Sequence, residues 1–149
     1  MEKLTKGLSG LAGEYFVAGE LTRRGYIVTL TLRNTKAFDI LVSNESATRA
    51  VTIQVKTNQY ASRKWVLNEK AEELFSDSLF YVFVNLNGFS GQPTYHIVPS
   101  EIVANHCRDS HSEWLNTPGK QGQQRNDSSM RNFWDKEGKY LNAWHLLGL

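Results

Sequence analysis

Two short runs in which polar and apolar residues alternate, over 38–42 and 50–57, constrain this chain more than any other feature. Both runs have the length of a single strand and are rich in valine and isoleucine, which favour strands. The polar stretch between them, over 43–46, is typical of a turn. The pattern therefore predicts an antiparallel β-hairpin, whose register follows from the two faces that the alternation defines.

The alternation divides the side chains of this hairpin between two faces. In the first run Ile40 and Val42 fall on one face and Asp39 on the other. In the second run Gln54 and Lys56 share a face, and antiparallel pairing sets Asp39 opposite Gln54 with Lys56 as a diagonal neighbour. We therefore expect an aspartate, an amide and an ammonium group together on one face of the sheet. The simpler alternatives are a solvated strand face and an aspartate that caps a loop.

The residues before the hairpin predict a helix over 8–24, followed by Gly25 as a C-terminal glycine. The apolar residues that recur at helical spacing are Leu8, Leu11, Tyr15, Ala18 and Leu21. On a helical wheel Glu14 falls inside this apolar arc. Burying a carboxylate is costly unless a partner compensates it. Glu14 is therefore either a functional carboxylate beside the sheet or an edge residue that turns out to solvent.

The remainder of the chain predicts further strands and helices around the hairpin. Strands are expected over 26–32, 65–67, 79–86 and 94–98, and helices over 68–74, from 99 towards 107, and over 136–147. A Gly-, Gln-, Asn- and Ser-rich stretch over 117–129 predicts a loop. This order favours one α/β domain over 1–149, with a central mixed β-sheet flanked by helices. Its core would span about 7–98 and a C-terminal helical extension about 99–149.

Composition limits the classes of function. A chain of 149 residues with 40% hydrophobic residues suits one domain with a real core. The net charge of +2 leaves any nucleic-acid contact to a local patch. The single cysteine, Cys107, excludes an intramolecular disulfide and a cysteine-rich zinc site. Residues 1–6 lack the apolar run of a secretory signal, and no stretch approaches the roughly 20 apolar residues of a membrane span. We therefore expect a soluble cytoplasmic protein with no membrane partner.

Taken together, the helix and the two strands resemble the PD-(D/E)XK, or restriction-endonuclease-like, nuclease superfamily. The matching segments are Gly10-Leu11-Ala12-Gly13-Glu14, Phe38-Asp39-Ile40-Leu41-Val42 and Ile53-Gln54-Val55-Lys56-Thr57. The pattern is most similar to the archaeal Holliday-junction-resolvase branch and covers about residues 7–86. Two positions depart from the family. Phe38 replaces a proline that binds no metal, and Gln54 replaces the acidic residue of the (D/E)XK element, which gives a QxK variant.

The resemblance implies a restriction-endonuclease-like core and a metal-dependent endonuclease that hydrolyses phosphodiester bonds in DNA with Mg²⁺, or with Mn²⁺. The implied catalytic residues are Glu14, Asp39, Gln54 and Lys56. Asp39, Gln54, Glu14 and the carbonyl of Val55 would hold the metal, and Lys56 would orient water or offset charge in the transition state. Because an amide oxygen carries no negative charge, Gln54 should weaken metal binding. Resolvase-like relatives act as dimers, which implies a homodimer here as well.

Basic and aromatic residues near this site suggest DNA contacts. The loops around it carry four basic residues that could contact phosphates: Arg33, Lys36, Arg63 and Lys64. Ordinary solvated charges are the alternative for each of them. Trp65 favours packing over base stacking, and Tyr60 could stack on a base. The aromatic residues of the last third favour packing onto the sheet or a dimer interface; they are Trp114, Phe133, Trp134, Tyr140 and Trp144.

The sequence leaves one rival function open. A non-catalytic module for binding nucleic acid or protein could keep the nuclease fold after losing its chemistry. Gln54 and the modest net charge favour this alternative. The two functions differ in whether a divalent metal binds at Asp39 and whether Lys56 is needed for anything besides folding.

Overall fold

The computed structural model describes residues 3–32 and 37–149. Its helices are α1 (Lys6–Arg23) and α2 (Ser100–Asn116), and its short 3-10 helices are η1 (Glu69–Glu72) and η2 (Trp144–Leu147). Its strands are β1 (Ile27–Leu30), β2 (Ile40–Ser43), β3 (Ala50–Asn58), β4 (Lys64–Asn68), β5 (Leu79–Asn85), β6 (Thr94–Pro99) and β7 (Met130–Trp134). No helix within these residues is long and apolar enough to cross a membrane.

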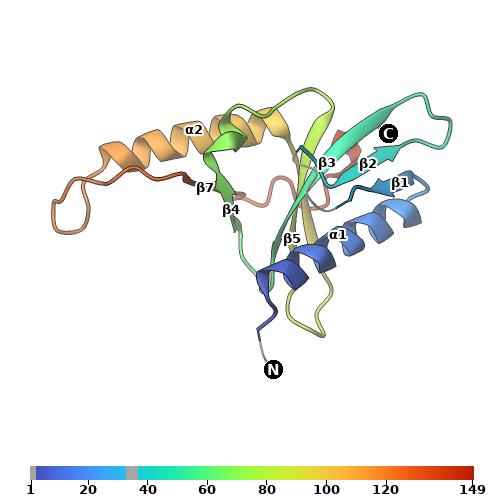
Figure 1. The fold of residues 1–149 in the computed structure, drawn as a ribbon, viewed down its shortest axis with the longest axis horizontal. Helices are drawn as coiled ribbons and strands as arrows, with labels where there is room; N and C mark the ends of the chain where they lie inside the picture. Colours follow the sequence, from blue (N-terminus) through green and yellow to red (C-terminus); the bar gives the residue numbers. More distant parts are fainter. Residues whose placement is uncertain (1–2, 33–36) are drawn as a thin grey trace.

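Five of the strands form the central sheet, in the order β1-β2-β3-β5-β6. β3 and β5 run parallel, while the other three pairs are antiparallel, so the sheet is mixed. Figure 1 shows α1 along the β1–β3 side of the molecule and α2 on the side of β4 and β7. The expected architecture, a mixed sheet flanked by helices, is confirmed.

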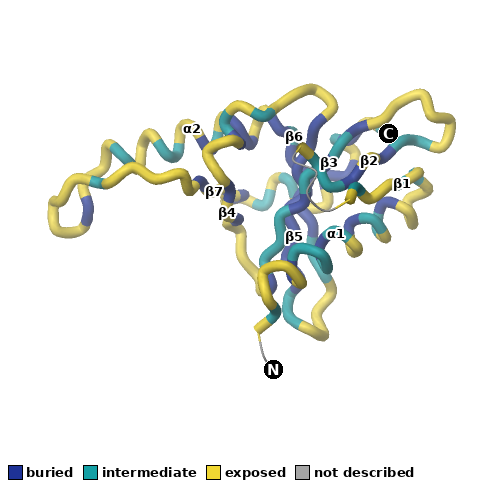
Figure 2. Tube along the Cα trace, viewed as in Figure 1, coloured by how far each residue is buried: buried dark blue, intermediate teal, exposed yellow. Residues whose placement is uncertain are grey.

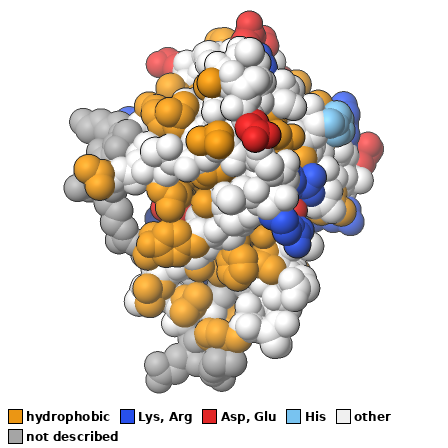
Figure 3. All heavy atoms as spheres, turned by 90° about the vertical axis from the view of Figure 1, so that its right-hand side faces the viewer, with side chains coloured by type: hydrophobic (Ala, Val, Ile, Leu, Met, Phe, Trp, Pro, Cys, Tyr) orange, Lys and Arg blue, Asp and Glu red, His pale blue; other side chains and the backbone are white. Residues whose placement is uncertain are grey.

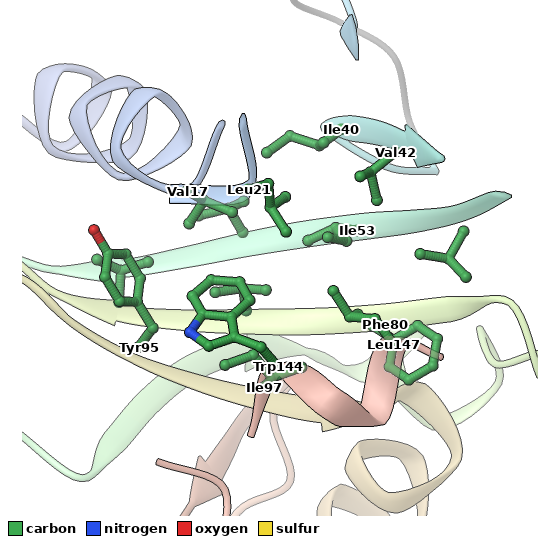
Figure 4. Close-up of a cluster of buried hydrophobic side chains, with 14 of the residues drawn as sticks. Val17, Leu21, Ile40, Val42, Ile53, Phe80, Tyr95, Ile97, Trp144 and Leu147 are labelled. Atoms are coloured by element: carbon green, nitrogen blue, oxygen red, sulfur yellow. The ribbon is translucent and has the colours of Figure 1, made fainter. Parts of the chain in front are cut away.

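The central strand β5 is buried along its whole length (Figure 2), and its side chains enter two separate cores. Phe80, Val82 and Val84 face the core beneath α1, which also contains Val17 and Leu21. The C-terminal 3-10 helix η2 contributes to the same core. In Figure 4 its Trp144 and Leu147 pack near Ile97 and Phe80. The second core lies between the sheet and α2; its buried members include Trp65, Tyr81, Phe83, Val103, Cys107 and Phe133. The two cores fix the central sheet from both faces.

Strands β4 and β7 form a second, two-stranded antiparallel sheet that pairs Trp65 with Phe133. The rings of Phe83 and Phe133 stack at 4.7 Å, and those of Trp65 and Phe83 lie 5.1 Å apart. The outer half of α2 and the connection to β7 project from the body of the molecule and are mostly exposed (Figure 2). The last third of the chain therefore both covers the central sheet and forms an arm beside it.

The helix expected over 136–147 is wrong, and with it the fully helical character of the C-terminal extension. The structure has β7 there, then a series of turns, and only the short 3-10 helix η2. The carboxylate of Asp135 accepts hydrogen bonds from the backbone N–H groups of Lys139 and Tyr140 at 3.0 and 3.1 Å. Gly138 and Asn142 adopt positive φ angles of 66° and 53°, which interrupt a helix. The helix expected over 68–74 is likewise only the 3-10 turn η1, although Asn68 caps it as expected.

Candidate active site

Asp39 lies at the entrance to β2, on the face of the sheet opposite α1. Ile40 and Val42 are fully buried beneath α1, and Leu41 between them is exposed, as the alternation predicts. Pairing of Ile40 with Ile53 in the β2–β3 ladder, extended by one residue, sets Asp39 across from Gln54. The structure therefore places these two side chains on one face, where Lys56 follows Gln54 two residues later on the same strand.

Hydrogen bonds hold Asp39 against β3. Its carboxylate oxygen Oδ2 accepts the backbone N–H of Val55 at 2.7 Å, and its own N–H donates to the carbonyl of Ile53 at 2.8 Å. A carboxylate bond of this length is charge-assisted and strong. Because the N–H and C=O of one strand residue point to the same side, the carbonyl of Val55 also faces the Asp39 side of β3. The Asp39 carboxylate and the Val55 carbonyl thus lie on the same side of β3, next to the end of the β2–β3 ladder.

Gln54 is oriented by a contact that glutamate could not make. Its amide Nε2 donates to the carbonyl of Ala37 at 2.7 Å, which ties the approach to β2 onto β3. The amide NH₂ is used in this bond, so the side-chain oxygen is the atom left to act as a ligand. Gln54 therefore has a structural role besides any role in metal binding.

Glu14 lies on α1, which approaches β3 unusually closely. Gly13 packs against Thr57: a Cβ built on Gly13 would overlap the Thr57 hydroxyl and lie 3.0 Å from Thr57 Cβ. This contact brings the helical turn that holds Glu14 to the part of β3 that holds Lys56. Glu14 and Lys56 are both half-buried. The predicted constellation thus combines a helix that packs on one face of β3 with strand residues that point to the other face.

The face of α1 that is buried differs from the apolar stripe expected from the sequence. The buried residues are Ser9, Gly13, Val17 and Leu21, while Leu8 and Tyr15 are exposed. Ser9 and Gly13 lack bulk, which is why the helix can lie so close to β3. Glu14 therefore borders the buried stripe and does not lie in its middle.

Replacing Gly13 with alanine should destabilise the protein, because the new methyl group meets the stiff, β-branched Thr57. Overpacking costs about 1–3 kcal/mol, against the roughly 1 kcal/mol that alanine gains over glycine in a helix. Gly10→Ala is the matched control, since nothing lies within 4 Å of a Cβ there. Thermal melting should show a lower Tm for Gly13→Ala and a higher one for Gly10→Ala. Adding Thr57→Ala should restore the Tm of Gly13→Ala, and equal Tm values for the two glycine variants would contradict the close packing.

The oxygen ligands that the candidate site offers suit a hard divalent cation, but few of them are negatively charged. Carboxylate, amide and carbonyl oxygens are the ligands that Mg²⁺ takes in proteins. Asp39, the Gln54 side chain and the Val55 carbonyl fit this chemistry, with Glu14 on the adjoining helix. Within residues 3–32 and 37–149, however, no group of three or more His, Cys, Asp or Glu side chains is placed to hold a metal ion. The residues fit a metal held weakly and completed by water or phosphate oxygens.

The four basic residues expected to contact phosphates have different surroundings. Arg33 and Lys36 lie outside the described residues. Arg63 donates to the carbonyl of Lys136 at 2.7 Å, so it fastens β4 to the segment after β7. Lys64 is exposed and its Nζ lies 4.5 Å from the centre of the Trp134 ring. Arg63 is therefore held by a hydrogen bond, whereas among the described residues the side chain of Lys64 is held solely by a ring contact.

The aromatic residues divide between core and surface. Trp65 is 1% exposed and donates from its ring nitrogen to the carbonyl of Val84 at 3.0 Å, which confirms the expected packing. Phe133 and Trp144 are buried in the two cores. Trp114 and Trp134 are 40% and 41% exposed, so they do not pack the chain onto the sheet.

One buried pair of polar groups was missed by sequence reasoning. His96 Nδ1 and Asp135 Oδ2 lie 2.6 Å apart, and both side chains are almost fully buried. Neither residue lies in a motif, and the two meet only because β6 and the turn after β7 are neighbours in space. The thiol of Cys107 is buried as well, which raises its pKa to about 11 and makes it a poor nucleophile or metal ligand at neutral pH.

This mixed sheet, with α1 and α2 on its two sides, is the fold of the restriction-endonuclease-like nucleases. Solved structures that share it include the following two. A bacterial homing endonuclease, I-Ssp6803I, matches with a TM-score of 0.57 and 14% identity, covering 98% of this chain and 94% of that chain. The Holliday junction resolvase Hjc of the archaeal hyperthermophile Archaeoglobus fulgidus matches with a TM-score of 0.50 and 10% identity, covering 85% and 84%. No protein family model and no curated protein matches the chain. At these identities the likeness shows the fold.

Proposed function

We propose that this protein is a metal-dependent endonuclease that hydrolyses phosphodiester bonds in DNA. The observation that carries the proposal is the hydrogen bond from the Val55 N–H to the Asp39 carboxylate. It joins the entrance of β2 to β3 between Gln54 and Lys56. The two fold neighbours, a homing endonuclease and a Holliday junction resolvase, support a role in DNA cleavage.

In the proposed reaction each residue has a limited task. Asp39, held by Val55, presents a fixed oxygen; Gln54 and the Val55 carbonyl supply neutral oxygens beside it. A divalent ion bound to these oxygens, Mg²⁺ or Mn²⁺, would polarise the phosphate and activate a water molecule. Lys56 would place an ammonium group against the charge that develops on the phosphate. Glu14 would hold water or a further cation from the helix side.

The test is cleavage of labelled DNA by the purified protein. Holliday junction, duplex and single-stranded substrates are incubated with Mg²⁺, Mn²⁺ or EDTA. Under the proposal at least one substrate is cut with either metal and none with EDTA. Cleavage that persists in EDTA would contradict metal dependence, and the substrate that is cut fastest would identify the DNA structure that the protein recognises.

A second candidate function is a DNA-binding module without catalysis. The hydrogen bond from the Gln54 side chain to the Ala37 carbonyl favours it, because this structural contact is enough to account for a glutamine at position 54. The absence of a three-acid cluster among the described residues points the same way. DNA binding without cleavage of any substrate in either metal would support this candidate.

We include a homodimer in the proposal, as the resemblance to junction resolvases implies. β1 is an edge strand of the central sheet, and its Ile27 and Leu30 are 56% and 39% exposed. Figure 3 views the molecule from the side of β1 and the β2–β3 hairpin, where hydrophobic side chains gather and few charges interrupt them. An exposed apolar edge strand readily pairs with another chain. Sedimentation velocity should show a dimer at micromolar concentration, and a monomer would remove this part of the proposal.

A further inference from the structure

A hollow between α2 and β7, which we call the α2–β7 groove, has the composition of a nucleic-acid site. Its cavity measures about 270 Å³, and its walls include Lys64, His106, His111, Trp114, Arg131 and Trp134. The described residues that line it include no aspartate or glutamate. α2 and β7, which supply most of its lining residues, belong to the arm that projects beside the central sheet (Figure 1).

Each of the two exposed tryptophans of the groove, Trp114 and Trp134, has a cationic side chain over its ring. Lys64 and Lys136 place their Nζ atoms 4.5 and 5.4 Å from the centre of the Trp134 ring. The guanidinium of Arg125 lies 4.9 Å from the Trp114 ring. Among the described residues none of these three cations has a carboxylate partner. Aromatic rings beside unpaired cations are the means by which proteins hold single-stranded nucleic acid, through base stacking and phosphate contacts.

The wall that holds Trp134 is fixed. His106 Nε2 accepts the backbone N–H of Trp134 at 3.2 Å, and the His106 ring packs edge-on against Phe133 at 5.0 Å. Burial lowers the pKa of His106, which keeps its ring a neutral acceptor near pH 7. Other basic groups of the groove have carboxylate partners, since His111 pairs with Asp127 and Arg131 with Glu72. The unbalanced charge therefore belongs to Lys64, Lys136 and Arg125.

The groove is joined to the candidate active site through β3. Asn58 follows Lys56 by two residues and lies on the same face of the strand. Its amide Nδ2 donates to the carbonyl of Lys64 at 2.7 Å. A DNA strand whose phosphate sits at Lys56 would therefore have only a short path to Lys64 and the groove.

We propose that the α2–β7 groove binds unpaired, single-stranded DNA next to the candidate active site, with a base stacked on Trp134 and phosphates on Lys64 and Arg125. The inference rests on the proposed function, because it assigns the surface beside that site to the same substrate. A base inside a duplex shows only its edges, so the Trp134 indole can stack only on an unpaired base. The lysines over Trp134 have flexible stems and turn to the phosphates when a base takes their place.

The test measures binding of a fluorescent oligothymidine of about 12 nucleotides in EDTA, by anisotropy. Trp134→Leu should weaken binding about tenfold, whereas Trp134→Phe, which keeps an aromatic face, should stay within about threefold of wild type. Lys64→Gln should weaken binding and make the salt dependence shallower by about 0.7, the value for one phosphate on single-stranded DNA. Phe89→Leu and Lys70→Gln are the controls, since both replace exposed residues on other elements and should bind like wild type. Melting curves check that each variant is folded.

Three outcomes would overturn the inference: wild-type affinity in Trp134→Leu, equal loss in the Phe89→Leu control, or a duplex of the same length that binds as tightly as the single strand. Lys56→Ala separates this inference from the proposed function: it should nearly abolish cleavage, while the loss of oligothymidine binding caused by Trp134→Leu should be the same in the Lys56→Ala background as in wild type. Wild-type binding by Trp134→Leu beside loss of cleavage in Lys56→Ala would refute the groove and leave the nuclease intact. The opposite pair of results would refute the nuclease and leave the groove as a DNA-binding site.

Discussion

Lys56→Ala should reduce metal-dependent DNA cleavage by about 100- to 1,000-fold, the usual loss when one preorganised charge is removed from a transition state. DNA affinity should fall only by the contribution of a single phosphate contact, as it should in Lys64→Gln. Initial rates at saturating Mg²⁺, measured beside binding in EDTA, separate the two effects. Lys56→Arg should recover only part of the rate, because a guanidinium spreads its charge over a plane.

Asp39→Asn is the companion variant that isolates the charge of the carboxylate. Asparagine keeps an oxygen that can accept the Val55 N–H, so the end of the β2–β3 ladder should remain closed. The Tm should stay near that of wild type while cleavage is lost. Lys70→Ala, on η1, controls for the removal of a lysine as such. Full activity in both Lys56→Ala and Asp39→Asn would show that any cleavage comes from elsewhere.

Asp135→Ala should destabilise the protein more than any other single change discussed. Its carboxylate is buried and accepts two backbone N–H groups besides its contact with His96. Removing it leaves the buried His96 ring and the two part-buried N–H groups without these hydrogen bonds, and breaking a buried pair in this way costs about 3–5 kcal/mol. For a domain of this size the Tm should fall by about 10 °C or more.

Asp127→Ala is the matched control, since Asp127 contacts His111 at 2.8 Å but has a side chain that is 70% exposed. The hydrogen bond from His111 is the main reason that the pKa of Asp127 is lowered, yet solvent screens an exposed pair. Its Tm should barely change in differential scanning calorimetry. Similar Tm shifts for Asp127→Ala and Asp135→Ala would contradict the importance of burial at His96.

Local patterns were enough to predict the sheet and the shared face of Asp39, Gln54 and Lys56. Alternation is a property of a strand by itself, and a short turn fixes which residues of a hairpin face each other. The faces of Ile40 and Val42 followed from the same reasoning and are confirmed. The roles of the site residues remain predictions, which only the cleavage and binding experiments test.

The features that the sequence did not predict all depend on contacts between distant segments. Burial of Ser9 and Gly13 depends on how close α1 comes to Thr57, and small residues carry no apolar signal. The strand β7 depends on its pairing with β4, in which Phe133 lies opposite Trp65. Taken alone, the short run of residues in β7 could equally begin a helix. The α2–β7 groove likewise joins Lys64 to residues from the last third of the chain. The periodicity of a single sequence cannot predict such contacts between distant segments.

The pairing of β4 with β7 has an evolutionary consequence. Phe83 stacks on Tyr81 within β5 and on Phe133 from β7, while Trp65 of β4 packs beside it. A change of volume at any one of these rings must be absorbed by the others. In descendants of this protein, positions 65, 83 and 133 should therefore covary, while the exposed tips of the arm drift freely. The arm could diversify its recognition of ligands without disturbing the strand that carries Lys56.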